Sequence, residues 1–354
     1  MEFGLMFFAS SEDSLTGNIY DLVKECAIYG DENDFSSIWV PERHFTEFGG
    51  VYNNPAILHA AIAGVTKRIR LYSGSVVVPL HDPVRIAEEW SMVDNLSNGR
   101  VSLSIAPGWN PNDFIFFPEN YDQRYDIMYK NIEQVKRLWK GETVQRKGGN
   151  GQVVDIKIYP TPVQKRIPMC VTVSNSLEGF KLSGEKGYDI LTALLDHTME
   201  ELAEKIQCYR RAREENGLDP KEGRITLMLH TYVGKDDQQA KEEARKPYCD
   251  FLKRNGSLLK GLAQNRGSKF SLDSLTEEDI DEFVNFLYTR FANTKGLIGD
   301  KESCKEIVEH AQEAGVDKIT CLLDFGPPAH KIIENLENLK VLKESFNPIS
   351  SSTL

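Results

Sequence analysis

The chain has 354 residues, of which 40% are hydrophobic and 27% charged, as is ordinary for a globular protein with a sizeable core. Its 42 basic and 53 acidic residues give a formal net charge of −11, so composition argues against a nucleic-acid binder or a protein held on an anionic membrane surface. Six scattered cysteines without a CxxC pair, and no apolar run of spanning length, predict a cytoplasmic protein without membrane segments.

Short apolar runs alternate with longer amphipathic segments through the first part of the chain. We expect strands over residues 3–8, 37–40, 69–78 and 100–105. We expect helices from about residue 19, over 55–65, from 82 to about 96, and over 125–140. Asp82-Pro83 is a favoured helix start, because aspartate caps the first turn and proline fits the first helical position.

The second part continues this alternation after one interruption. Residues 141–160 place a glycine-rich turn at 148–151 between two β-prone runs, which predicts a β-hairpin excursion. Strands are expected over 169–173, 190–194, 225–233 and 318–323, and helices from 178, over 198–216, from 236, and at about 301–314 and 330–345. Residues 255–285 are first polar and then acidic, which indicates an insertion rather than a core element.

Eight strands that are each followed by a helix predict a closed (β/α)8 TIM barrel. We expect it to form a single domain over 1–354, with the hairpin near 141–160 and the insertion near 255–285 as its two excursions. An open doubly wound sheet would also alternate in this way. It usually carries a glycine-rich turn after its first strand, where this chain has Ala9-Ser10-Ser11-Glu12.

The segment after the second expected strand carries the most unusual residues. Catalytic groups of such barrels lie at the carboxyl ends of the strands, and here Glu42, Arg43 and His44 are consecutive and flanked by aromatic residues. A carboxylate, a guanidinium and an imidazole together could transfer protons in a site with little water. The alternative is a structural ion pair beside a histidine whose hydrogen bonds are satisfied.

Two further strand ends carry small or flat side chains. Gly74 and Ser75 would let a flat ring system approach the backbone, although simple packing of the barrel interior explains them better on the residues alone. After the fourth strand, Ala106 and Gly108 permit a close approach and Trp109 supplies a flat surface. The alternative at this second place is a turn with one buried aromatic side chain.

The fourth place follows the fifth strand. Ser174, Asn175, Ser176 and Gly179 lead into a helix and could bind an anion through hydroxyls and free backbone N–H groups. An ordinary helix cap is the more conservative interpretation. The other histidines have structural explanations, His81 because it precedes a helix cap, and no pair of histidines has metal-ligand spacing, so we expect no metal.

Several segments together resemble the bacterial luciferase family of flavin monooxygenases. They are PERHFTEFGG at 41–50, DPVRIAEEWSMVDNLSNGRVSLSIAPGWNPNDF at 82–114, VSNSLEG at 173–179 and IGDKESCKEIVEHAQEAGVDKITC at 298–321. The resemblance covers about residues 3 to 345. Among subgroups, the chain most resembles the luciferase-like monooxygenase domains of natural-product assembly lines.

The resemblance implies a barrel that binds FMN at the carboxyl ends of its strands. Reduced FMN would react with O₂ to a C4a-(hydro)peroxide that oxygenates an organic substrate of specialised metabolism, either small or bound to a carrier protein. His44 would be the proton donor or acceptor, with Glu42 orienting it. The phosphate would lie against Ser176 and its neighbours, and Ser75 under the flavin ring beside a cis peptide at Gly74–Ser75.

This chain departs from the luciferase pattern at two positions. Arg43 stands where luciferase has the first of two adjacent histidines, and Pro107 stands where luciferase has an arginine that contacts the flavin phosphate. The phosphate charge must therefore be neutralised by another residue, or FMN must bind more loosely. Loose binding would suit an enzyme that receives reduced FMN from a separate flavin reductase.

The resemblance also implies a homodimer formed through the helices after strands two and three, and residues 255–285 are the natural candidate for a lid. A deazaflavin (F420) hydride-transfer oxidoreductase with the same barrel is the alternative enzyme. A catalytically idle flavin-binding protein is the third possibility, and an unchanged turnover after substitution of His44 by alanine would support it.

Overall fold

The computed structural model describes residues 1–9, 18–194, 197–254 and 276–346. Eight parallel strands form a closed ring, in which the last strand pairs with the first. In chain order they are β1 (Glu2–Met6), β2 (Ser37–Val40), β3 (Arg70–Val77), β4 (Val101–Ala106), β7 (Met169–Thr172), β8 (Asp189–Ala193), β9 (Ile225–Val233) and β11 (Lys318–Leu322). The predicted (β/α)8 barrel is therefore confirmed.

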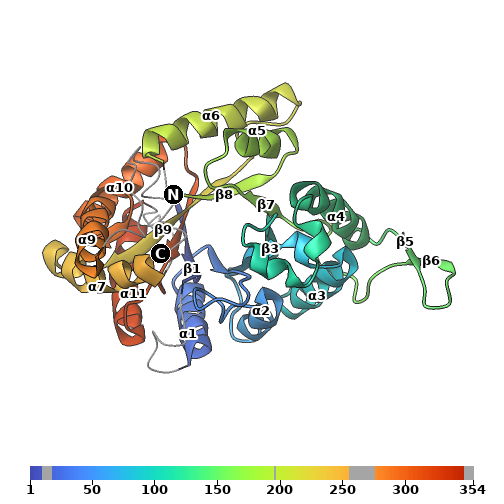
Figure 1. Cartoon of the computed structure of the whole chain (residues 1–354), viewed down its shortest axis with the longest axis horizontal. Helices are drawn as coiled ribbons and strands as arrows, with labels where there is room; N and C mark the ends of the chain where they lie inside the picture. The colour runs from blue at the N-terminus through green and yellow to red at the C-terminus, as the bar shows by residue number, and fades with distance from the viewer. Residues whose placement is uncertain (10–17, 195–196, 255–275, 347–354) are drawn as a thin grey trace, which may run out of the picture.

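The helices lie around the outside of this ring (Figure 1). They are α1 (Ile19–Glu32), α2 (Pro55–Ala63), α3 (Pro83–Leu96), α4 (Arg124–Trp139), α5 (Leu177–Glu185), α6 (Met199–Glu215), α7 (Asp237–Arg254), α9 (Glu277–Thr294), α10 (Lys301–Glu313) and α11 (Ala329–Phe346). Short 3₁₀ helices cover Val78–Leu80, Pro111–Ile115 and Pro118–Asn120. Helix α3 starts as predicted, because the Asp82 carboxylate accepts a hydrogen bond of 2.8 Å from the Val84 amide and proline follows the cap.

The core has an inner and an outer layer because successive strand residues point to opposite faces of the sheet. The inner layer fills the barrel with Met6, Trp39, Tyr72, Leu191 and Leu322 among others. Trp39 and Tyr72 stack there with ring centroids 3.9 Å apart. The outer layer is the large apolar cluster between the strands and the helices. This rigid barrel holds fixed the strand ends from which the loops start.

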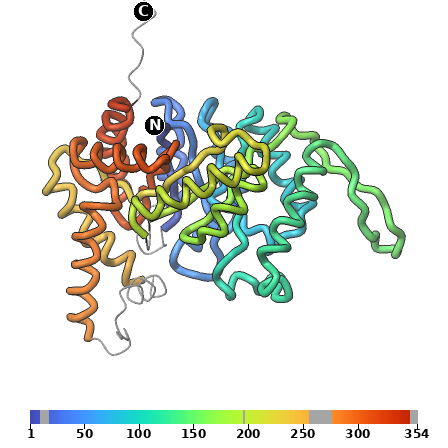
Figure 2. The backbone as a smooth tube through the Cα atoms, turned by 90° about the horizontal axis from the view of Figure 1, so that it is seen from above, coloured from blue at the N-terminus to red at the C-terminus, as the bar shows by residue number. Residues whose placement is uncertain are grey.

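The predicted hairpin is present as the antiparallel pair β5 (Val144–Lys147) and β6 (Val153–Ile156). Both views show it standing clear of the barrel (Figures 1 and 2). Two features of the structure differ from expectation. Strand β10 (Leu297–Gly299), which the sequence did not predict, pairs with the end of β9, and residues 277–285 are the first half of helix α9.

Much of the predicted insertion and lid, at 255–275, lies outside the described residues. The expectation of a single domain over 1–354 stays a prediction. Among the helices that the structure describes, none is long and apolar enough to cross a membrane.

Candidate active site at the carboxyl ends of the strands

Glu42 organises the segment after β2, and its side chain is buried, with 3% of the residue exposed. One carboxylate oxygen, Oε1, accepts hydrogen bonds from Nε2 of His44 at 2.9 Å and from Nε2 of His81 at 2.6 Å. The other, Oε2, accepts from the Val77 amide at 2.8 Å. The structure thus brings Glu42 and His44 together as predicted, and adds a second imidazole.

Glu42 and His81 stabilise each other's charged form. Burial on its own would raise the pKa of Glu42, but His81, the hydrogen bonds from both imidazoles and that from Val77 outweigh it and lower the pKa below its usual value. Burial would likewise lower the pKa of His81, but the Glu42 carboxylate outweighs it and raises that pKa. The group is therefore a buried carboxylate that stays ionised and stabilises a proton on His81.

Arg43 points elsewhere, among aromatic rings. Its guanidinium carbon lies 4.8 Å from the centroid of the Trp109 ring, 4.9 Å from that of Phe48 and 5.7 Å from that of Phe8. Burial lowers the pKa of Arg43, and the nearby Asp113 carboxyl acts in the opposite direction. Three loops, after β1, β2 and β4, therefore meet at this guanidinium.

Hydroxyl groups gather where β3, β4 and β7 end. Ser75 Oγ lies 2.9 Å from Ser104 Oγ and also contacts Thr172 Oγ1, and the latter two oxygens are 2.9 Å apart. The Gly74–Ser75 peptide is cis, as expected. A Cβ on Gly74 would lie 3.2 Å from Met6 and 3.3 Å from Trp39, so this glycine also packs against the barrel interior.

The loop after β4 is shaped by Gly108, which has a φ of +83°. A Cβ there would lie only 2.7 Å from Val77 Cγ1. The alternative of a turn around a buried aromatic side chain is wrong for Trp109, because 58% of this residue is exposed. Ala106 ends β4 and is half-buried. The exposed Trp109 ring therefore lies beside the tight backbone turn at Gly108.

The loop after β7 leads into α5 with Ser176 as its cap. Ser176 Oγ accepts a hydrogen bond of 3.1 Å from the Gly179 amide, which confirms the conservative interpretation of a helix cap. The first amides of a helix have no partner within it and attract anions. Lys205, from α6, donates a hydrogen bond to Asn175 Oδ1, so a lysine lies beside this helix N-terminus. Ser174 is exposed next to them.

Sequence reasoning missed three residues of this region. The sequence places His81 at a helix start, and only the fold brings it to Glu42. Lys205 is one of many charged residues on α6 and has no local signal. Asp113 is buried and accepts a hydrogen bond of 2.8 Å from Asn110. In the sequence it follows Asn110-Pro111-Asn112, which gives no local signal of burial. Among the described residues, no group of three histidine, cysteine, aspartate or glutamate side chains could hold a metal ion.

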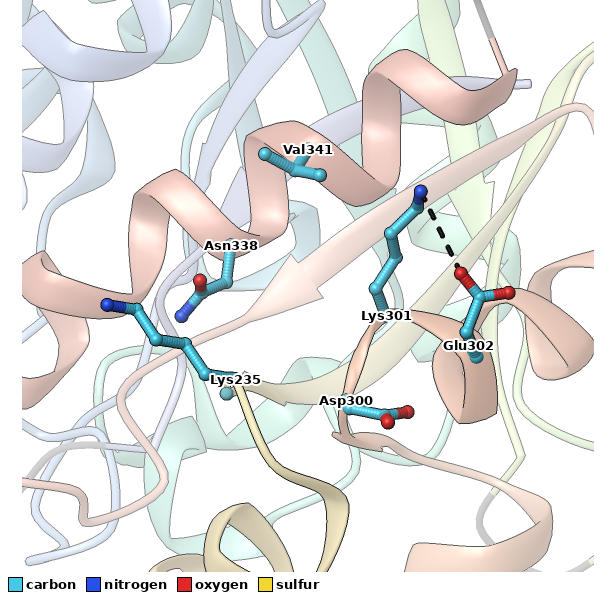
Figure 3. A pocket seen from close by; sticks show the side chains of 7 residues that line it. Lys235, Asp300, Lys301, Glu302, Asn338 and Val341 are labelled. Carbon is cyan, nitrogen blue, oxygen red and sulfur yellow. Dashed lines mark ion pairs between the residues drawn. The ribbon is translucent and has the colours of Figure 1, made fainter.

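A separate pocket of about 310 Å³ lies at the ends of β9 and β10, beside α10 and α11. Its walls include Lys235, Asn338 and the ion pair between Lys301 and Glu302 (Figure 3). None of the predicted site residues lines it. We therefore place the candidate active site at the loops after β2, β3, β4 and β7 and not in this pocket.

The model of the luciferase-like monooxygenase family matches residues 1–318. The oxygenase component of flavin-dependent trigonelline monooxygenase from Acinetobacter baylyi is 26% identical over 93% of this chain and 90% of its own length. The alkanal monooxygenase alpha chain of Photobacterium leiognathi is 24% identical over 88% of both chains.

Solved structures share the fold. Monooxygenase RslO1 from Streptomyces bottropensis has a TM-score of 0.79, with 19% identity, 98% of this chain and 100% of that chain covered. The oxygenating constituent of the type II Baeyer–Villiger enzyme 3,6-diketocamphane monooxygenase from Pseudomonas putida, in complex with FMN, has a TM-score of 0.71, with 18% identity and coverage of 100% and 99%. An F420-dependent secondary alcohol dehydrogenase has a TM-score of 0.69, with 18% identity and coverage of 97% and 98%.

Proposed function

The chain belongs to the luciferase-like monooxygenase family, and on that premise we propose that it uses reduced FMN and O₂ to oxygenate an organic substrate. The observation that carries this proposal is the buried contact of His44 with Glu42 at the end of β2. A buried acid–base pair at the carboxyl end of a barrel strand is where a flavin enzyme needs a proton donor. Bound reduced FMN would supply the electrons that activate O₂.

The residues of the site fit FMN at both of its ends. Ser176, the first amides of α5 and Lys205 form a positive position for the phosphate. Lys205 would thereby take the role of the luciferase arginine at whose position this chain has Pro107. Ser75 and the exposed Trp109 provide small and flat surfaces for the ring system.

The protein's own groups then have four tasks. His44 exchanges a proton at its imidazole nitrogens with the reacting groups, while Glu42 fixes the orientation of the ring. His81 keeps the Glu42 carboxylate ionised. His44 is 8% exposed, with the rings of Phe45 and Phe116 at centroid distances of 5.6 and 5.2 Å, so little water reaches this proton transfer.

We further propose a homodimer through α2 and α3. Ile57 on α2 is 71% exposed, and Met92 and Leu96, one turn apart on α3, are 55% and 61% exposed. Apolar side chains that gather on adjacent helices are typical of a protein interface. Six free cysteines agree with a cytoplasmic location.

The proposal extends to the source of reduced flavin and to the substrate. We propose that a separate reductase supplies reduced FMN, since the loop after β1 lacks the glycine-rich turn of a dinucleotide site. We propose a substrate from specialised metabolism, small or carried by a protein, on the sequence resemblance alone.

An F420-dependent reaction is the second candidate, because an F420 enzyme shares the fold. Anaerobic fluorescence titrations with reduced FMN, riboflavin and reduced F420 separate the two candidates. We expect FMN to bind most tightly, and Lys205→Ala to weaken FMN binding while leaving riboflavin binding unchanged. The variant Lys221→Ala, outside the site, is the control. Tight binding of F420 together with weak binding of FMN would overturn the proposal.

A further inference from the structure

Arg43 is a buried cation whose side chain forms no hydrogen bond within the part of the chain that the structure describes. Only 5% of the residue is exposed, and its Nε atom has no partner. Its backbone amide donates to the Tyr52 carbonyl at 2.9 Å, but no described oxygen accepts a hydrogen bond from the guanidinium. A buried polar group without a partner is uncommon in native proteins and calls for an explanation.

The other buried arginines show that this fold can satisfy a guanidinium. Arg100 donates five hydrogen bonds, to carbonyl and hydroxyl oxygens around the ends of α2 and α3. Arg213 donates to the Asp219 carbonyl at 2.9 Å. Both of these arginines lie away from the candidate site, where they tie backbone segments together. Arg43, which lies within the site, differs from them.

The Asp113 carboxylate does not accept a hydrogen bond from the Arg43 guanidinium. Asp113 is held by Asn110, whose amide donates to its carboxylate at 2.8 Å. No described carboxylate lies within 4.0 Å of the Arg43 guanidinium. Burial raises the pKa of Asp113, although Arg43 and His44 act against that rise. Asp113 therefore adds a distant negative charge and leaves the guanidinium donors unused.

The surroundings of Arg43 decide which ligand suits it. The rings of Phe8, Phe48 and Trp109 offer π faces, which attract a cation but accept no strong hydrogen bond. They also displace water, so that an ionic contact is stronger than it would be in solvent. A guanidinium presents a planar fork of donors that matches a carboxylate in a bidentate contact.

We propose that Arg43 binds a carboxylate group of the substrate, so that the enzyme acts on organic acids with an apolar body. This inference rests on the proposed function, since it places the substrate in the same site. The carboxylate would occupy the guanidinium fork, and the apolar body of the substrate would lie against Phe48. His44, the next residue in the chain, would then face the part of the substrate that is oxygenated.

FMN is not the anion we assign to Arg43. The phosphate position that we propose is built from the loop after β7 and from α6. The rings around Arg43 come instead from the ends of β1 and β2 and from the loop after β4. Lys205 and Arg43 therefore lie beside different loops. We assign the FMN phosphate to Lys205 and the substrate carboxylate to Arg43.

Calorimetric titration with benzoate tests the proposal, because benzoate joins a carboxylate to a flat apolar ring. Benzamide, which has the same shape without the charge, is the matched ligand. Titrations use the FMN-loaded wild type, Arg43→Lys and Arg43→Met, and FMN affinity is measured for each protein as a test of folding. We expect the wild type to prefer benzoate over benzamide by about 10- to 100-fold. Arg43→Met should lose this preference, and Arg43→Lys should keep part of it.

Two results would overturn the assignment. One is a wild type that does not prefer benzoate, or a preference that survives in Arg43→Met. The other is a loss of FMN affinity in Arg43→Met and Arg43→Lys, which would assign the guanidinium to the flavin. If the wild type binds no FMN, the proposed function fails. The benzoate titration on the flavin-free protein then still decides whether Arg43 is a carboxylate site.

Discussion

At the scale of single residues, the Glu42 carboxylate joins two imidazoles from different loops. A buried carboxylate is costly unless it is hydrogen-bonded and faces positive charge. Here His44, His81 and the Val77 amide provide both. The same contacts occupy Nε2 of His44, so a proton exchange with a substrate or a flavin would use Nδ1.

Replacing His44 by asparagine tests its role. Asparagine can keep a hydrogen bond to Glu42 but cannot carry a proton at neutral pH. We expect substrate oxygenation to fall by about 10²- to 10⁴-fold, with little change in FMN affinity. The measurement is product formation beside a fluorescence titration of FMN. Unchanged product formation would contradict a catalytic role and favour an idle flavin-binding protein.

His81→Gln tests the electrostatic coupling. Because His81 lowers the pKa of Glu42, its removal should raise that pKa. The carboxylate would then be lost at a higher pH as acid is added, and the acidic limb of the activity profile should move to higher pH. His310→Gln, an exposed position on α10, is the control. If the pH profiles of kcat/KM coincide for His81→Gln and the wild type, the contact between His81 and Glu42 does not affect catalysis.

At this scale the sequence could predict contacts between residues that are close together in the chain, but not contacts between residues of different elements. Glu42 and His44 are two positions apart and could be assigned together, as could the cap of α5 at Ser176. His81 and Lys205 reach the site from other elements, and no local pattern distinguishes them from surface residues. The exposure of Trp109 depends on loop packing, which composition does not report.

At the scale of elements, the loop after β4 depends on a backbone conformation that few residues adopt. Gly108 has a φ of +83°, and a Cβ there would meet Val77 and Phe114 at 2.7 and 2.9 Å. Such close contacts force neighbouring side chains to move. The shape of this loop, and the position of Trp109 after it, therefore require glycine.

A comparison of Gly108→Ala with Gly141→Ala separates the conformational cost of a positive φ from the cost of overpacking. Gly141 has nearly the same φ, +82°, and a Cβ there would have no heavy atom within 4 Å, so its substitution carries the conformational cost of about 1–2 kcal/mol alone. Gly108→Ala should lower the free energy of unfolding by about 1–3 kcal/mol more, through overpacking. Denaturant unfolding measures both values. Equal losses in the two variants would show that the loop relaxes freely.

Most elements could be predicted from periodicity and caps. The eight barrel strands and the hairpin are each flanked by clear turn or cap residues, as at Asp82-Pro83. Strand β10 is only three residues long, too short for an alternation to be seen. Helix α9 begins in an acidic stretch, which suggests a surface insertion, yet its Val284 and Tyr288 pack into an apolar cluster with Tyr248 of α7.

At the scale of the whole molecule, the exposed apolar side chains on α2 and α3 are best explained by a second copy of the chain. Leu96→Glu places a charge in the proposed interface, and burying an unpaired charge is costly. We expect the variant to be monomeric in analytical ultracentrifugation where the wild type is a dimer. Val341→Glu, at a partly exposed position on α11, is the control. A wild-type monomer at micromolar concentration would contradict the dimer.

The central claim is that this barrel reacts bound reduced FMN with O₂ in a protected site. The most direct measurement mixes the protein, loaded with chemically reduced FMN, with oxygenated buffer and follows the visible absorbance of the flavin. The account predicts that oxidised FMN returns much more slowly than it does from free reduced FMN, and that less hydrogen peroxide is released when substrate is present. Reoxidation as fast as in free solution, with all the consumed O₂ recovered as hydrogen peroxide, would contradict it.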